Sequence, residues 1–287
     1  MGRARKLHSA IFMVGLGAML VSCTEEIPFE LNNQEFARVI VDAEVTTVMK
    51  HHEVKLSKTI SFYDRTIPPP ISGAAVEVST NGTTYLFEET EQKGVYQSKD
   101  SFAAEIGKDY DLRIEVEGEV YESTSGIIKA PRIDSLGYEK LKGVPPGRPT
   151  GDEEIDDNYF VLSIWFQEPQ EVNQYYMLRT FKNGVLQTDT ATELIFFDDL
   201  IYNGEYLDDI KFDVVEAQIG DTIDVELWTI SEEYYLGMAS LFSETVYRGG
   251  LFDPPPSNVE SNLSNGALGF FFTGDRDRKS VILTEED

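Results

Sequence analysis

Apolar and polar residues alternate over much of this chain, and that alternation limits what it can fold into. Val76 and Val78 lie on one side of such a run, and the Asn81-Gly82 dipeptide separates it from the next run. Successive strand residues point to opposite faces of a sheet, and Asn-Gly tolerates the positive φ angles of a tight hairpin turn. Similar runs and turn signals recur through residues 35–130. We therefore predict an antiparallel β-sandwich of transthyretin-like or Ig-like type there.

A second β-rich domain is predicted for residues 159–287. Apolar runs restart at Tyr159, after a segment at residues 131–158 whose prolines, glycines and acidic residues indicate a linker or loop. Ser231 can cap an amphipathic helix near residues 232–247, because two glutamates follow it and apolar residues then recur at helical spacing. We expect this helix to pack across the second sheet, which makes the predicted fold class mainly β.

The N-terminus has the composition of an export signal. Basic residues precede a short apolar run, which is typical of a signal peptide, here residues 1–22. The run ends in a sequence similar to the bacterial lipobox: Leu20, Val21, Ser22 and Cys23. In a lipobox a diacylglycerol is attached to the cysteine thiol, and the peptide is cut before that cysteine. We predict that Cys23 carries the lipid and that residues 23–34 are anchor and linker.

The anchor and the net charge predict where the chain is located and what it binds. Thr24, Glu25 and Glu26 resemble the signal that sends Bacteroidota lipoproteins to the outer face of the outer membrane. The formal net charge is −27, and binding to nucleic acid needs Lys and Arg to replace released counterions. We therefore expect outer-membrane lipid as a partner, through the acylated Cys23, and no nucleic acid.

Residues suited to catalysis are sparse. Apart from His8 in the predicted signal peptide, the histidines are His51 and His52. Neighbouring strand residues point to opposite faces, so this pair makes a poor metal site. The chain contains no nucleophile elbow, zinc-helix or phosphate-loop motif. We predict no enzyme activity, no catalytic residue, no metal site and no cofactor.

Acidic clusters leave calcium ligation and paired-carboxylate hydrolysis as weaker alternatives. They occur at residues 152–157, at Asp198-Asp199 and at Asp208-Asp209, without the regular spacing of a calcium-binding loop. A chain with 51 acidic residues contains such pairs by chance. Solvated loop charge is the simpler interpretation.

The C-terminal part contains the most distinctive motif. Pro-Pro-Ser-Asn at residues 255–258 is followed by Gly-Ala-Leu-Gly-x-Phe at residues 266–271. Together with the lipobox, the Gly-Ala-x-Val of residues 73–76 and the Tyr-rich helix, this ending resembles the Bacteroidota lipoproteins of domain-of-unknown-function family 4249. The resemblance spans nearly the whole mature chain. It brings no catalytic residues, and only Cys23 carries over as a site.

The resemblance implies a role beside a transporter. Members of that family are typically associated with TonB-dependent outer-membrane receptors of the SusC type. The implied function is a surface-exposed, non-enzymatic accessory or substrate-binding subunit, with the receptor barrel as its partner. A free-standing glycan- or peptide-binding adhesin is an alternative, and a calcium-dependent hydrolase is a third.

Overall fold

The predicted mainly β fold is confirmed in the computed structural model, which describes residues 37–60, 66–141, 158–170, 173–188, 190, 193–246 and 259–285. The strands of the first half are β1 (Val39–Thr46), β2 (Glu53–Lys58), β3 (Ala75–Thr80), β4 (Thr83–Glu89), β5 (Val95–Ser98), β6 (Asp109–Val116) and β7 (Glu119–Gly126). Those of the second half are β8 (Ile133–Lys140), β9 (Tyr159–Gln167), β10 (Tyr175–Lys182), β11 (Val185–Leu186), β12 (Ile195–Asp198), β13 (Tyr206–Glu216), β14 (Thr222–Ile230) and β15 (Leu268–Ile282). The described residues contain one helix, α2 (Glu232–Val246).

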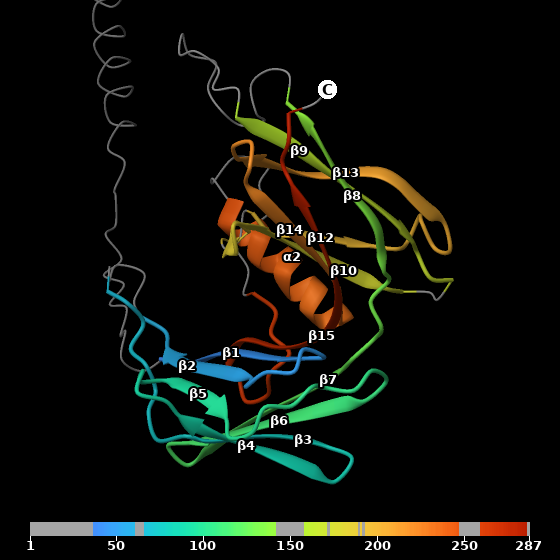
Figure 1. Cartoon of the computed structure of the whole chain (residues 1–287). Helices are drawn as coiled ribbons and strands as arrows, with labels where there is room; N and C mark the ends of the chain where they lie inside the picture. The colour runs from blue at the N-terminus through green and yellow to red at the C-terminus, as the bar shows by residue number, and fades with distance from the viewer. Residues whose placement is uncertain are drawn as a thin grey trace, which may run out of the picture. The chain divides into compact units, whose positions relative to one another are not determined.

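The long strand β15 joins the two halves of the chain. Its first part, Leu268–Gly274, pairs in parallel with β1, and its second part, Asp275–Ile282, pairs antiparallel with β14. One sheet therefore runs in the order β11-β10-β14-β15-β1-β2-β5-β4-β3-β6-β7, with β12 also paired to β10. Figure 1 shows β15, in red, passing from the strands of the first half to those of the second. The two predicted domains thus share a sheet within one compact unit, residues 37–287.

The predicted linker at residues 131–158 begins with a strand, so that part of the prediction is wrong. β8 pairs with β9 in a second sheet of order β13-β9-β8. Two carboxylates of β15 fix the backbone just before β8 and at its first residue. Asp275 accepts a hydrogen bond from the N–H of Ala130 at 2.9 Å, and Asp277 accepts one from the N–H of Ile133 at 2.8 Å. β8 is stabilised by these distant partners, while its few apolar residues give only a weak local signal.

The second half of the chain is built in layers, which Figure 1 shows with α2 in orange over one face of the sheet. Neighbouring residues of β14 point to opposite faces of it. Leu227 lies in the apolar core between this sheet and β13-β9-β8, and Trp228 lies in the cluster beneath α2. A separate core that includes Val41 and Leu112 fills the first half.

Helix α2 begins where the sequence predicts. Ser231 caps it, because its Oγ accepts a hydrogen bond from the N–H of Tyr234 at 3.2 Å. Gly237 lies against the ring of Phe270 so closely that a Cβ there would clash with the ring. The predicted apolar stripe is confirmed at Met238, which is buried, whereas Phe242 remains 37% exposed.

Ser261 and Asn262 precede the Gly-Ala-Leu-Gly-x-Phe part of the C-terminal motif and support it, while Pro-Pro-Ser-Asn at residues 255–258 lies outside the described residues. The amide of Asn262 binds the backbone of Phe271 in both directions, donating to its C=O at 2.8 Å and accepting from its N–H at 2.9 Å. The hydroxyl of Ser261 donates to the C=O of Gly269 at 2.7 Å. These bonds satisfy backbone groups at the start of β15. Ser261 and Asn262 therefore fix the position of the first residues of β15.

The two neighbouring histidines differ in burial. The His52 ring is fully buried, with Nε2 2.9 Å from the C=O of Phe102, while His51 is exposed. Burial lowers the pKa of His52 to about 4, and the positive charge of Lys50 adds to this shift. The hydrogen bond to Phe102 and the negative charge of Glu44 oppose it. The fold therefore holds His52 neutral.

We expect the fold to lose stability as the pH falls from 6.5 towards 4, because the unfolded chain binds a proton on His52 that the folded chain does not bind. The difference between the unfolded and folded pKa of His52 corresponds to a loss of about 3 kcal/mol in the free energy of unfolding at the lower end of this pH range. Unfolding free energies measured between pH 7 and pH 4 should fall less steeply for His52→Gln than for the wild type. The matched variant His51→Gln should keep the wild-type slope, and equal slopes in all three proteins would refute this account of His52.

Candidate functional site

The loop between β12 and β13 presents two neighbouring aliphatic side chains to solvent. Leu200 is 81% exposed and Ile201 is 74% exposed, and Tyr202 beside them is 39% exposed. Single exposed apolar residues are common, whereas neighbouring exposed apolar residues on one loop form a candidate binding surface. We call residues 200–202 the apolar tip.

Hydrogen bonds hold the apolar tip in place. The N–H of Leu200 donates to Oδ1 of Asp198 at 3.1 Å. The N–H of Tyr202 donates to the C=O of Asp199 at 2.9 Å, and that of Glu205 donates to the C=O of Tyr202 at 2.8 Å. Because a preorganised loop loses less conformational freedom on binding, this support favours recognition by the tip.

Polar side chains are buried beneath the tip. Glu168, Gln174 and Asp199 are 1%, 2% and 4% exposed, and we call these three residues the acidic base. The hydroxyl of Tyr176 lies 3.0 Å from Oε1 of Glu168 and 2.8 Å from Oε1 of Gln174. Glu168 also accepts the N–H of Gly204, and the N–H of Asp199 donates to the C=O of Gln174 at 3.1 Å. The acidic base thus connects β9, β10 and the tip.

The two carboxylates of the acidic base lack a basic partner among the described residues. No Lys or Arg of these residues forms an ion pair with Glu168 or Asp199. Burial raises the pKa of Glu168 above its ordinary value, and the nearby Asp199 adds to this shift. The hydrogen bonds from Gly204 and Tyr176 oppose it. Two buried carboxyl groups therefore lie close enough to influence each other.

Aromatic side chains connect the region of the tip to α2. The ring of Tyr235 lies 4.8 Å from that of Tyr175 and 5.6 Å from that of Phe196, centroid to centroid. Phe196 also meets Phe242 edge-on at 6.4 Å. The hydroxyl of Tyr235 donates to Oδ2 of Asp198 at 3.2 Å. The start of α2 and the end of β12 thus form one packed surface.

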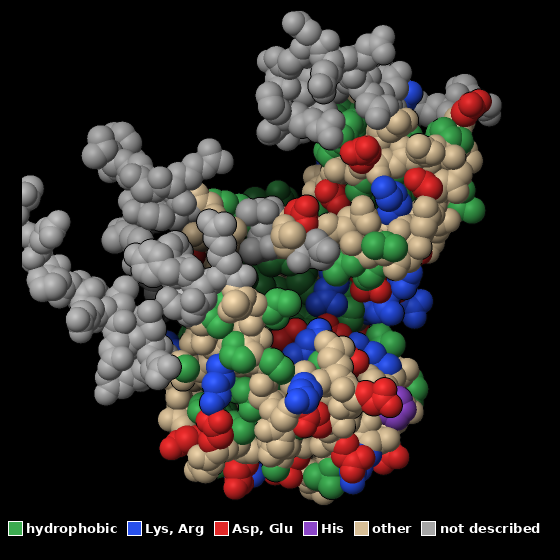
Figure 2. Space-filling model, turned by 90° about the vertical axis from the view of Figure 1, so that its left-hand side faces the viewer, with side chains coloured by type: hydrophobic (Ala, Val, Ile, Leu, Met, Phe, Trp, Pro, Cys, Tyr) green, Lys and Arg blue, Asp and Glu red, His purple; other side chains and the backbone are tan. Residues whose placement is uncertain are grey.

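A second polar network lies on the sheet beneath α2. Arg179 of β10 pairs with Glu44 of β1 at 3.1 Å, and its guanidinium lies 5.0 Å from the ring of Trp228. Burial disfavours the charge on Glu44, but Arg179 and Lys50 outweigh this effect and lower its pKa. Each charged group of this network has a partner in the chain, which indicates a structural role. Basic and acidic side chains also lie side by side across the middle of the face in Figure 2.

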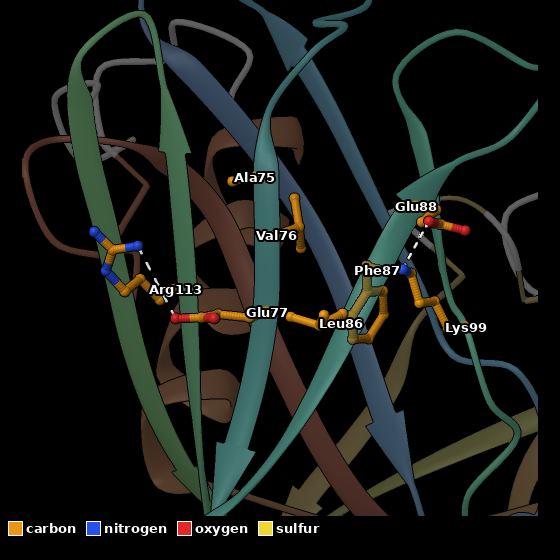
Figure 3. A pocket seen from close by; sticks show the side chains of 8 residues that line it. All are labelled: Ala75, Val76, Glu77, Leu86, Phe87, Glu88, Lys99 and Arg113. Carbon is orange, nitrogen blue, oxygen red and sulfur yellow. Dashed lines mark ion pairs between the residues drawn. The ribbon is translucent and has the colours of Figure 1, made fainter.

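A shallow groove lies over β3, β4 and β6, and two ion pairs and four apolar side chains line it (Figure 3). Arg113 lies 4.0 Å from Glu77 on the neighbouring strand, and Lys99 lies 2.8 Å from Glu88. These charges are exposed, and exposed ion pairs contribute little to stability. The groove offers charge to solvent but no enclosed apolar surface for a small ligand.

The predicted lipid site and export signal lie outside the described residues. This applies to Leu20, Val21, Ser22, Cys23, Thr24, Glu25 and Glu26. The acidic run at residues 152–157 also lies outside them. Across the part of the chain that the structure describes, no helix is long and apolar enough to cross a membrane.

The structure separates the remaining acidic pairs. Asp199 is buried in the acidic base while Asp198 contacts the start of α2. Asp208 accepts a hydrogen bond from Nε1 of Trp165, and Asp209 is exposed. None of the described residues forms a group of three or more His, Cys, Asp or Glu side chains suited to a metal ion.

Of the acidic base, only Asp199 is named by the sequence, in the pair Asp198-Asp199; Glu168, Gln174 and the apolar tip are not predicted. Glu168 and Gln174 flank the Pro-Gln-Glu-Val-Asn segment, which carries no local signal for a buried polar group. The local signal for the tip was Leu200-Ile201-Tyr202 between acidic residues and Asn203-Gly204, because a turn sequence seldom holds such an apolar run.

The comparisons with known proteins place the chain in a family without assigning it a function. No curated protein matches it. The family model described as "Domain of unknown function (DUF4249)" matches residues 24–280, which is most of the chain. The chain therefore belongs to the DUF4249 family.

Proposed function

We propose that this protein is a lipid-anchored, non-enzymatic accessory or substrate-binding subunit of a TonB-dependent transporter of the SusC type, on the outer face of a Bacteroidota outer membrane. Cys23 would carry the acyl chains, and Leu20, Val21 and Ser22 would direct its processing. Thr24, Glu25 and Glu26 would direct the body to the cell surface. The receptor barrel would be its protein partner.

The observation that best supports a binding role is the exposed apolar tip, whose loop is held by hydrogen bonds. Leu200 and Ile201 are mostly exposed although backbone hydrogen bonds hold their loop. Apolar residues of this kind gain free energy when a partner covers them, at roughly 25 cal/mol per Å² of apolar area. The family match covers residues 24–280 and leaves the predicted signal peptide outside, which also fits a mature body that begins at Cys23.

Copurification tests the partner. The full chain, crosslinked in intact cells and extracted in mild detergent, should bring down a TonB-dependent receptor identified by mass spectrometry. Leu200→Ser combined with Ile201→Ser should reduce the recovered receptor at least about tenfold, since hot-spot truncations commonly cost more than 1.4 kcal/mol. The matched control is Ile67→Ser, at a side chain that is 90% exposed on another loop.

The outcomes separate the alternatives. Recovery of the receptor with the wild type and Ile67→Ser, but not with the double variant, supports the proposal. Recovery of the wild type without any barrel would favour a free-standing adhesin. Equal recovery from all three proteins would show that the apolar tip is not the contact surface.

A further inference from the structure

The acidic base has the features of a cation site. Alternate residues of β12 point to opposite faces. Asp198 reaches Tyr235 of α2, whereas Phe197 lies on the other face, 5.2 Å from the ring of Tyr176. Asp199 follows the last residue of β12, its N–H donates to the C=O of Gln174 at 3.1 Å, and its carboxyl group lies close enough to Glu168 to raise the pKa of that residue. The Tyr176 hydroxyl in turn contacts Glu168 and Gln174, so three oxygen-bearing side chains converge there.

One oxygen of this group has no partner. Asp199 is 4% exposed, and its Oδ2 is fully buried without a hydrogen bond among the described residues. A buried carboxylate oxygen without a donor is costly, and buried charges are normally paired with a basic group or coordinate a metal ion. No described Lys or Arg pairs with Glu168 or Asp199, so a cation from solution would supply the missing positive charge.

We propose that Glu168, Asp199 and Gln174 form a binding site for a divalent cation of the calcium class. The donors are two carboxylates and an amide oxygen, all hard oxygen ligands, and Ca²⁺ takes six to eight such ligands with flexible geometry. Imidazole nitrogen and thiolate sulfur, which zinc and copper prefer, are absent from these three residues. Two protein carboxylates with waters completing the shell place the affinity in the weaker, extracellular range, a Kd of roughly 10⁻⁴ to 10⁻³ M.

The bound cation would stiffen the apolar tip. Glu168 accepts the N–H of Gly204 at one end of the tip loop, and Asp199 begins the loop at the other end. A cation shared by the two carboxylates would therefore tie both ends of residues 199–204 to β9 and β10. This inference concerns the chain itself and does not rest on the proposed transporter partner.

Direct binding measurements on the full chain in detergent test the site. Tb³⁺, a luminescent substitute for Ca²⁺, should be sensitised by Tyr176 in the wild type, and added Ca²⁺ should displace it. Calorimetry with Ca²⁺ alone should give a component of about one site per chain in the affinity range above. Chymotrypsin cleavage after Tyr202 should slow when Ca²⁺ is present.

Neutral variants of similar shape supply the comparison. Glu168→Gln and Asp199→Asn remove a buried like charge and should fold, yet each should weaken Ca²⁺ binding at least about tenfold, since ligands and even their supporting groups commonly matter by 10- to 100-fold. Asp209→Asn is the matched control, because Asp209 is exposed and asparagine tolerates its positive φ of 55°.

Loss of the Tyr-sensitised Tb³⁺ signal and of Ca²⁺ protection in both neutral variants, with both retained in Asp209→Asn, supports the site. Two results overturn it. One is a wild-type protein that shows neither the Tb³⁺ signal nor a change in cleavage at millimolar Ca²⁺, in which case a retained proton neutralises the pair. The other is binding by Glu168→Gln and Asp199→Asn that equals the wild type.

Discussion

Gly269→Ala should destabilise the protein by about 3 kcal/mol or more, a loss large enough to unfold many proteins of ordinary stability. Gly269 has a φ of 90°, a conformation that side chains rarely adopt, and a Cβ there would collide with the backbone C=O of Val41. Val41 and Gly269 are register partners in the parallel pairing of β1 with β15. The clash would therefore separate the two strands that join the halves of the chain.

Gly266→Ala provides the matched control for this prediction. Gly266 also has a positive φ, of 70°, but its Cβ would meet nothing within 4 Å. Alanine there should cost only about 1 kcal/mol, the usual penalty for the left-handed conformation. Denaturant midpoints of the wild type and the two variants would give the comparison. Equal losses of unfolding free energy in the two variants would show that the clash between residue 269 and Val41 adds nothing to the cost of the substitution.

Cys23→Ser should move the protein from the membrane fraction to the soluble fraction. A single acyl chain gives only marginal binding, and stable anchoring needs at least two signals, each buried CH₂ contributing about 0.8 kcal/mol. A serine cannot form the thioether, and a body with a whole-chain charge of −27 has no electrostatic attraction to anionic lipid. Immunoblots of membrane and soluble fractions would measure the change.

The folded body should be unaffected by Cys23→Ser, since the substitution precedes the first described strand, β1. Circular dichroism spectra of the variant and the wild type should therefore agree. Retention of the serine variant in the membrane fraction, with an unchanged spectrum, would show that something other than the thiol holds the protein there.

The sequence predicts the locally determined parts of this fold. Asn81-Gly82 and Asn183-Gly184 both adopt the positive φ angles expected of tight hairpin turns. Ser231 caps α2 at the predicted position. Each of these features depends on the conformational preferences of a few neighbouring residues, which sequence patterns report directly.

The parts that sequence reasoning missed depend on partners far along the chain. The parallel pairing of β1 with β15 joins residues more than 200 positions apart, and no local pattern specifies it. Asp199 resembles Asp198 in sequence, yet Asp198 ends β12 and meets α2, whereas Asp199 follows the strand and is buried. The acidic base was therefore hidden within a pattern that otherwise indicates solvated charge.

The lipid anchor is the central claim of the proposed function, and the mass of the mature N-terminal peptide tests it most directly. The protein should be purified from membranes, digested and analysed by mass spectrometry. We expect a peptide that begins at Cys23 and carries the mass of a diacylglycerol group, with or without a further acyl chain. A peptide that begins upstream of Cys23, or a Cys23 with a free thiol, would contradict the account.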